Sequence, residues 1–153
     1  MKFAPPYPSR LAYRHAAPDG IQALGALSGY VSKAVDARLR ALIDLRVSQI
    51  NGCAYCVNMH TEEARAAGET QQRLDVLPVW HETGFFTEPE RAALNWAENV
   101  TRLGEEAVPD ALFAEMKRHF SEKEIVDLTL ATVAINAWNR ISIAFGNRPA
   151  PRK

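Results

Sequence analysis

Two cysteines and one histidine have the types and the spacing from which chemistry can be built. They are Cys53, Cys56 and His60, and at 3.6 residues per turn they fall within about 60° of one another on a helix. This spacing predicts two thiols and one imidazole on a single helical face. Such a dithiol can reduce a peroxide, because one thiolate attacks the O–O bond and becomes a sulfenic acid, and the other thiol then condenses with it and releases water.

The neighbouring residues assign different surroundings to the two thiols. Cys53 follows the turn-forming pair Asn51-Gly52, so we expect it at the N-terminus of a helix, where the dipole and the free N–H groups favour a thiolate. From this position we also expect Cys53 to be the more accessible of the two to an outside reductant. His60 lies one turn beyond Cys56 and can act there as a base or a proton shuttle.

A C-x-x-C pair also occurs by chance or as half of a zinc site, so a zinc- or partner-binding module built on the same three side chains is an alternative. A closed zinc site takes about four ligands, and the chain has no second C-x-x-C and no H-x-x-H. No motif surrounds the remaining histidines, for which we expect no direct role: His15, His81 and His119. We therefore predict neither a metal nor a cofactor.

The overall composition is that of a globular protein with balanced charge. The 153 residues include 18 Lys plus Arg and 18 Asp plus Glu, so the formal net charge is zero and nothing indicates a nucleic-acid partner. No apolar run approaches the roughly 20 residues that cross a membrane, and Met1–Pro8 lacks the apolar stretch of a signal peptide. We expect a cytoplasmic protein, in which a C-x-x-C pair is more often catalytic or metal-binding than structural.

The hydrophobic spacing predicts an all-α protein with a single-domain helical bundle and no sheet. Prolines concentrate in residues 1–18, which we interpret as an extended arm that either lies across a partner subunit or frays. Residues 19–153 then form the helical domain, with six to eight helices. We interpret Trp80, Trp96 and Trp138 as core residues.

Local signals place most of these helices. Asp19 can cap the first helix, and a second helix runs to the break at Asn51-Gly52. The C-x-x-C segment begins a third helix, which ends before Gly68. Residues 87–90 and 121–124 have the sequence of capping boxes and begin two later helices, the second of which runs to about Gly146.

The run from Leu45 to His60, LRVSQINGCAYCVNMH, resembles the alkyl hydroperoxidase D-like proteins of the carboxymuconolactone decarboxylase superfamily. The Ser-Gln-Ile-Asn-Gly lead-in, both cysteines and the histidine all agree with that family. Further similar segments extend the resemblance over most of the chain: 64–65, 68–70, 80–82, 86–88, 91–94 and 135–140.

The resemblance implies an all-α fold and a thiol-dependent peroxidase or disulfide reductase that reduces alkyl hydroperoxides. By the family's pattern, Cys56 attacks the peroxide, Cys53 resolves the intermediate and meets the reductant, and His60 belongs to a proton relay. The implied partners are a small-molecule peroxide, a thiol reductant that is a protein or of the lipoyl type, and further copies of the chain in a dimer, trimer or hexamer. The near-zero net charge does not oppose such self-association.

The chain departs from the family pattern at two positions. Active members carry a glutamate twelve residues before the first cysteine, where this chain has Ala41, and a histidine between the cysteines is replaced by Tyr55. Asp44, one turn after Ala41, can supply a carboxylate to His60 instead. A superfamily member with decarboxylase-type or unknown chemistry is the other alternative, although decarboxylases of the superfamily do not depend on a C-x-x-C pair.

Overall fold

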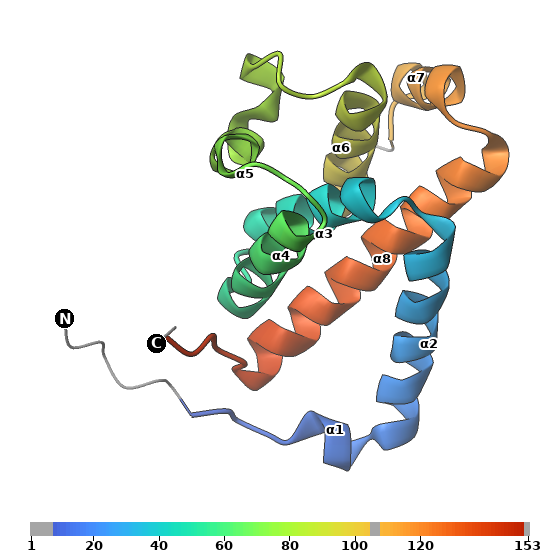
Figure 1. The fold of residues 1–153 in the computed structure, drawn as a ribbon. Helices are drawn as coiled ribbons and strands as arrows, with labels where there is room; N and C mark the ends of the chain where they lie inside the picture. Colours follow the sequence, from blue (N-terminus) through green and yellow to red (C-terminus); the bar gives the residue numbers. More distant parts are fainter. Residues whose placement is uncertain (1–7, 105–107, 152–153) are drawn as a thin grey trace.

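The computed structural model describes residues 8–104 and 108–151. Within them the chain forms eight α-helices and one 3-10 helix and has no strand, so the prediction of an all-α protein is confirmed (Figure 1). The elements are α1 (Tyr13–Ala16), α2 (Pro18–Ala34), α3 (Ala37–Asn51), α4 (Ala54–Ala66), α5 (Gln71–Val76), η1 (Leu77–Glu82), α6 (Glu88–Thr101), α7 (Asp110–His119) and α8 (Glu122–Phe145).

The predicted helix starts agree with the structure at both capping boxes. The Thr87 hydroxyl accepts from the Glu90 N–H and the Glu90 carboxylate accepts from the Thr87 N–H, and Ser121 and Glu124 do the same for α8. At α2 the expectation differs from the structure, because Ala17 is the N-cap and Pro18 occupies the first turn. Asp19 therefore lies inside the first turn, where its negative carboxylate interacts favourably with the positive end of the helix dipole.

Helix α3 separates two hydrophobic clusters and contributes to both. Ile43 and Val47 join a cluster with side chains of α2, α6, α7 and α8. Leu42 and Leu45, on the opposite face of α3, join a second cluster with α4, α5, η1 and α6. Because α3 is buried on two faces, it is a rigid platform for whatever follows it in sequence, which is the C-x-x-C segment.

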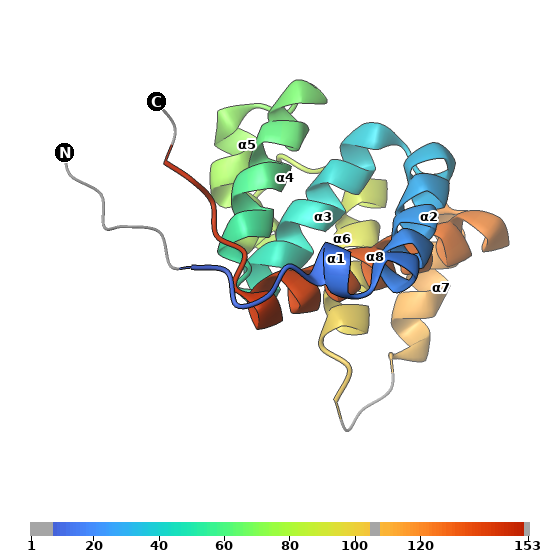
Figure 2. The same cartoon turned by 90° about the horizontal axis from the view of Figure 1, so that it is seen from below.

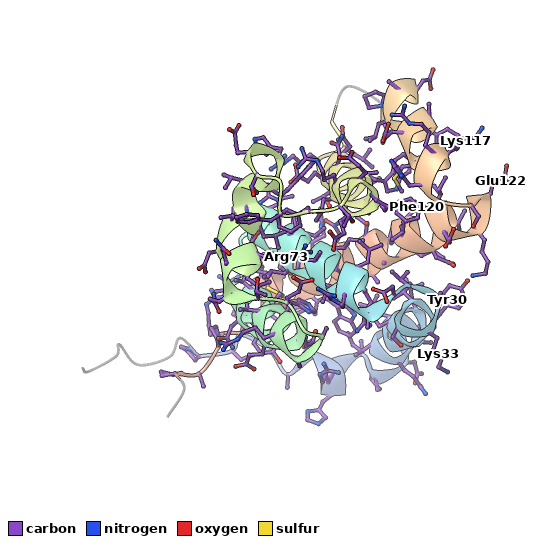
Figure 3. The ribbon with its side chains drawn as sticks, turned by 45° about the horizontal axis from the view of Figure 1, so that its top comes forward. Tyr30, Lys33, Arg73, Lys117, Phe120 and Glu122 are labelled. Atoms are coloured by element: carbon purple, nitrogen blue, oxygen red, sulfur yellow. A yellow bond between two sulfur atoms is a disulfide. The ribbon has the colours of Figure 1, made fainter. Side chains whose placement is uncertain are left out.

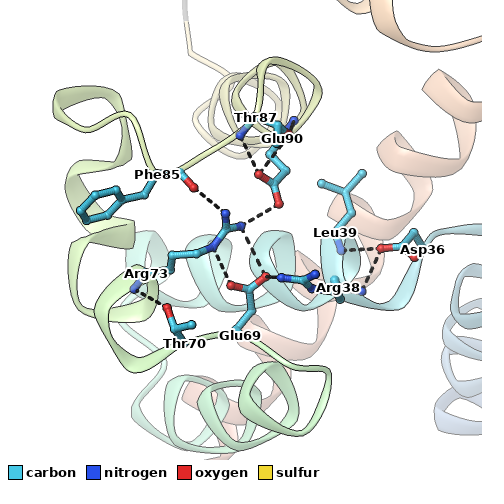
Figure 4. Close-up of polar contacts among 9 residues, drawn as sticks. All are labelled: Asp36, Arg38, Leu39, Glu69, Thr70, Arg73, Phe85, Thr87 and Glu90. Carbon is cyan, nitrogen blue, oxygen red and sulfur yellow. Dashed lines mark hydrogen bonds and ion pairs between the residues drawn. The ribbon is translucent and has the colours of Figure 1, made fainter.

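Ion pairs in the interior fix the segments around the second cluster. Arg73 lies near the middle of the molecule, whereas Lys33, Lys117 and Glu122 lie at its edge (Figure 3). Its guanidinium pairs with Glu69 at 2.7 Å and with Glu90 at 2.7 Å, which ties α5 to the start of α6 (Figure 4). The Glu69 side chain is fully buried, and its charge is stabilised by Arg73 and by Arg38 of α3, whose Nη2 lies 3.4 Å from its Oε1.

The beginning and the end of the described chain run side by side (Figure 2). Arg10 donates its backbone N–H to the carbonyl of Phe145 at 2.8 Å, and the Ser9 hydroxyl contacts the same carbonyl. Of the predicted arm, residues 8–12 are non-helical, whereas residues 13–16 form α1 and Pro18 begins α2. Residues 1–7 of the arm lie outside the described residues. No helix in the described part of the chain is long and apolar enough to cross a membrane.

Candidate active site

The C-x-x-C segment begins α4, as predicted, and a glycine turn places it there. Gly52 ends α3 with a φ of 69°, in the left-handed region that glycine adopts without strain. Cys53 is then the N-cap of α4, and its Sγ accepts the Cys56 N–H at 3.3 Å. The two sulfurs are 2.06 Å apart and form a disulfide, with Cα atoms 5.3 Å apart.

Both sulfurs of this disulfide are buried. Cys53 and Cys56 are each 1% exposed, so the expectation that Cys53 is the more accessible thiol is wrong for the disulfide form. The reason is tertiary packing, because α4 lies against α3 and α8. Position at a helix N-terminus and exposure to solvent are separate properties here.

His60 lies one turn beyond Cys56 and is buried, at 7% exposure. Its Nδ1 lies 2.7 Å from the Oε2 of Glu63, three residues further along α4. The hydrogen bond from His60 holds the pKa of the Glu63 carboxyl below its usual value. Sequence reasoning overlooked Glu63, although an i, i+3 His–Glu pair on a helix is a local signal that would have indicated it.

Asp44 reaches the same region from α3. Its side chain is 14% exposed, and its Oδ2 lies 3.9 Å from the Nε of Arg40. Burial raises the pKa of Asp44 to about 6, against the opposing effects of His60 and Arg40. Ala41, one turn before Asp44 on α3, is 5% exposed and packs in the second hydrophobic cluster.

A cavity of about 240 Å³ brings these groups together. Cys56, His60, Glu63 and Asp44 all line it, and Cys53 is not among its lining residues. The apolar part of its wall comes mainly from α2 and α8: Val31, Ala131, Ala134, Ile135 and Trp138. Trp138 is therefore a half-buried wall residue, whereas the other two tryptophans are buried as expected. The cavity offers an apolar surface beside one sulfur and a set of proton-carrying groups.

A buried polar network holds the turn before the cysteines against α8. Asn139, which is fully buried, accepts from the Asn51 amide at 2.9 Å and donates to the Ser48 hydroxyl at 3.0 Å. Asn136 accepts a second bond from Asn51 at 3.0 Å. These side chains lock the end of α3 in place, and Arg46 of the same helix pairs with Glu98 of α6. These side chains therefore act as structural contacts between α3, α6 and α8.

The other histidines lie away from the cavity lining. His119 pairs with Glu115 on α7, and His81 is exposed on η1. In residues 8–104 and 108–151, no group of three or more His, Cys, Asp or Glu side chains is placed to hold a metal ion.

The all-helical fold and a redox-capable C-x-x-C pair at a helix N-terminus define the alkyl hydroperoxidase D-like class. The model of the carboxymuconolactone decarboxylase family matches residues 16–99. The chain belongs to this family, as an alkyl hydroperoxidase D-like member.

Relatives and solved structures agree with that assignment. The chain is 42% identical to YdfG of Bacillus subtilis (strain 168) over 144 residues, which are 94% of this chain and 98% of YdfG. A structure from Agrobacterium tumefaciens matches with a TM-score of 0.89 and 42% identity over 94% of this chain and all of that one; it is a protein of unknown function with a suggested role as the antioxidant defence protein AhpD. A peroxidase-related protein from Ralstonia eutropha, with an AhpD core, has a TM-score of 0.78 at 23% identity over 90% of this chain and 74% of that one, and shares the fold.

Proposed function

We propose that the protein is a thiol-dependent peroxidase that reduces organic hydroperoxides through Cys53 and Cys56. One observation carries the proposal: the disulfide-forming pair begins a helix and presents Cys56 to a cavity that also holds His60. The helix N-terminus favours the thiolate, which is the nucleophile, and the apolar wall suits the organic part of a hydroperoxide.

In the proposed reaction the Cys56 thiolate attacks the terminal peroxide oxygen. An S–O bond forms, the O–O bond breaks, and an alcohol leaves after protonation, so Cys56 becomes a sulfenic acid. Cys53 then attacks the Cys56 sulfur, the S–S bond forms and water is released. Two electrons and two protons from a thiol reductant, a protein or a lipoyl-type dithiol, restore the pair.

Each site residue has one role in this scheme. Cys56 is the nucleophile, since it lines the cavity and His60 is four residues away on the same helical face. Cys53 is the resolving thiol, within disulfide distance of Cys56. His60 is the base that takes the proton of the Cys56 thiol.

We also propose where the protein acts in the cell and how it assembles. A cytoplasmic location agrees with a C-x-x-C pair that cycles between dithiol and disulfide. A homo-oligomer agrees with the zero formal charge and with the apolar side chains exposed on α8, among them Val126 and Val133.

The direct test is peroxide consumption by the wild type and two variants with a thiol reductant present. Cys56→Ser is expected to abolish consumption. Cys53→Ser is expected to react once, to leave a sulfenic acid on Cys56 that a selective reagent traps, and then to stop. Full turnover by Cys56→Ser with loss in Cys53→Ser would reverse the two roles, and full activity in both variants would reject the proposal.

A further inference from the structure

We propose that the carboxyl group of Asp44 is the general acid that protonates the departing alcohol oxygen when Cys56 attacks a hydroperoxide. This inference rests on the proposed peroxidase function and adds a catalytic residue to it. Asp44 comes from α3, whereas Cys56 and His60 come from α4, and the three side chains line one cavity. Ala41, one turn before Asp44 on α3, packs in the second hydrophobic cluster and is not among the residues that line the cavity.

The leaving group of this reaction needs a proton. An alkoxide is a strongly basic anion, so a group in the cavity that donates a proton to it as the O–O bond breaks lowers the barrier. A carboxyl group in the cavity that still holds its proton meets this need directly.

Glu63 cannot be that group. It is 49% exposed and its Oε2 pairs with the Nδ1 of His60 at 2.7 Å, so the ionised carboxylate is the favoured form. A neutral imidazole that donates through Nδ1 has Nε2 left as an acceptor, which makes His60 a base toward the Cys56 thiol. Glu63 therefore positions His60, and the acid must be a different residue.

The surroundings of Asp44 favour the protonated form. Its side chain is nearly buried, and the guanidinium of Arg40 approaches no nearer than 3.9 Å from Nε to Oδ2. That Nε is buried and has no hydrogen-bond partner among the described residues, so the Arg40–Asp44 pair is an incomplete ion pair. Burial accordingly raises the pKa of Asp44 to about 6, into the range useful for acid–base catalysis near neutral pH.

Seven charged or titratable groups line the cavity with Asp44. From α1, α3 and α4 they are Tyr13, Arg14, Arg40, Tyr55, Cys56, His60 and Glu63, while α2 and α8 contribute uncharged side chains. His60 and Arg40 lower the pKa of Asp44 and Glu63 raises it. In the dithiol form a Cys56 thiolate adds a further negative charge to the cavity, which favours the protonated form of Asp44.

The protons and electrons balance in this scheme. The electron pair of the broken O–O bond goes to the departing oxygen, which takes the Asp44 proton and leaves as the alcohol. The proton that His60 removed from the Cys56 thiol then restores the Asp44 carboxyl. Cys56 is oxidised to the sulfenic acid as the hydroperoxide is reduced, and no further reactant is needed.

The test compares two oxidants whose leaving groups differ. The fully reduced protein is mixed with cumene hydroperoxide or with peracetic acid, and the rate of thiol loss in a single turnover is measured between pH 5 and 9. Cumene hydroperoxide releases an alkoxide that needs a proton, whereas peracetic acid releases acetate, a stable anion. Asp44→Asn is expected to slow the first reaction by roughly a hundredfold near pH 6 and to leave the second within about threefold of the wild type.

Further variants separate acid catalysis from a structural effect. Asp44→Glu should restore most of the cumene hydroperoxide rate, and Asp75→Asn, an exposed carboxylate on α5, should change neither rate. The wild-type rate should fall as pH rises above the pKa of Asp44, and Asp44→Asn should lose this decline. If Asp44→Asn slows the reactions with both oxidants equally, or changes neither rate, the inference is overturned. The proposed function still stands in that case, because the wild-type dithiol reacts. Failure of the wild-type dithiol to react with either oxidant would instead reject the proposed function.

Discussion

At the scale of single residues, Asp44 and Glu63 carry the same chemical group and approach His60 from different helices. Glu63 is half exposed and hydrogen-bonded, which lowers the pKa of its carboxyl, whereas burial raises the pKa of Asp44. Paired carboxyls whose surroundings separate their pKa values are a recurrent arrangement in acid–base catalysis. Burial of the Asp44 carboxylate is unfavourable for folding at neutral pH. We therefore expect the wild type to be less stable than a variant with an uncharged side chain at this position.

Replacing Asp44 with asparagine should therefore make the disulfide form more stable at pH 7.5. The folded-state pKa of about 6 lies above the ordinary value of 3.8, so the contribution of the carboxyl to stability is complete below about pH 3.8 and is lost as pH rises through 6. The two values correspond to roughly 3 kcal/mol, and Asp44→Asn should gain up to that amount over the wild type between pH 4 and 7.5. Urea denaturation at both pH values measures it.

The exposed Asp75 provides the control for this measurement. Asp75→Asn should change the free energy of unfolding by a similar, small amount at both pH values, since an exposed carboxylate is already solvated. A stability difference between Asp44→Asn and the wild type that is the same at pH 4 and 7.5 would contradict the raised pKa.

At the scale of elements, the site depends on how α3 ends and α4 begins. Gly52 ends α3 in a left-handed conformation, and Asn51 is held against α8 by two asparagines. These contacts orient the first turn of α4 so that both cysteines are buried in the interior. The break that the sequence indicates at Asn51-Gly52 is therefore also the turn that places the disulfide in the interior.

Two glycine substitutions test this dependence on backbone conformation. Gly52→Ala should destabilise the protein by roughly 1–2 kcal/mol, because its φ of 69° strains a residue with a Cβ, although that Cβ would meet no atom within 4 Å. Gly29→Ala, in α2 and equally free of contacts, should stabilise by up to about 1 kcal/mol, since alanine favours a helix. Urea midpoints of the two variants should move in opposite directions, and a shift in the same direction would argue against strain at Gly52.

The features that local sequence predicted are those that depend on neighbours along the chain. The capping boxes at Thr87 and Ser121, the turn at Gly52 and the start of α4 are all set within a few residues. The short elements between residues 71 and 82 were not predicted, because α5 and η1 are too short to show hydrophobic periodicity and are fixed by tertiary ion pairs such as Arg73–Glu69.

The sequence indicated the side chains of the candidate site, but only part of the geometry that brings them together. The two cysteines and His60 came from spacing on one helix, and Asp44 was indicated as a carboxylate one turn from Ala41. The cavity wall from α2 and α8, including Trp138, depends on helices distant in sequence, which spacing cannot bring together. The burial of Cys53 was missed for the same reason, since exposure depends on packing against other elements.

At the scale of the whole molecule, α8 presents apolar side chains on its outer surface as well as toward the core. Val126 and Val133 are 57% and 45% exposed and lie two turns apart on one face of the helix. Leu130, between them, is half-buried and also packs against the first hydrophobic cluster. A second copy of the chain is the occupant we propose for this face, because zero net charge does not oppose contact between copies. A surface of this kind packs well against the same surface of a symmetry-related subunit.

Light scattering after size exclusion should give the wild type a mass that is a multiple of 17.0 kDa. Val133→Glu should move that mass toward 17.0 kDa, because a carboxylate buried without a partner in a subunit interface costs roughly 3–5 kcal/mol. Val79→Glu is the matched control, since Val79 on η1 is 47% exposed and should leave the assembly unchanged. A monomeric wild type at micromolar concentration would reject the oligomer, and dissociation by Val79→Glu alone would move the interface from α8 to the surface around η1.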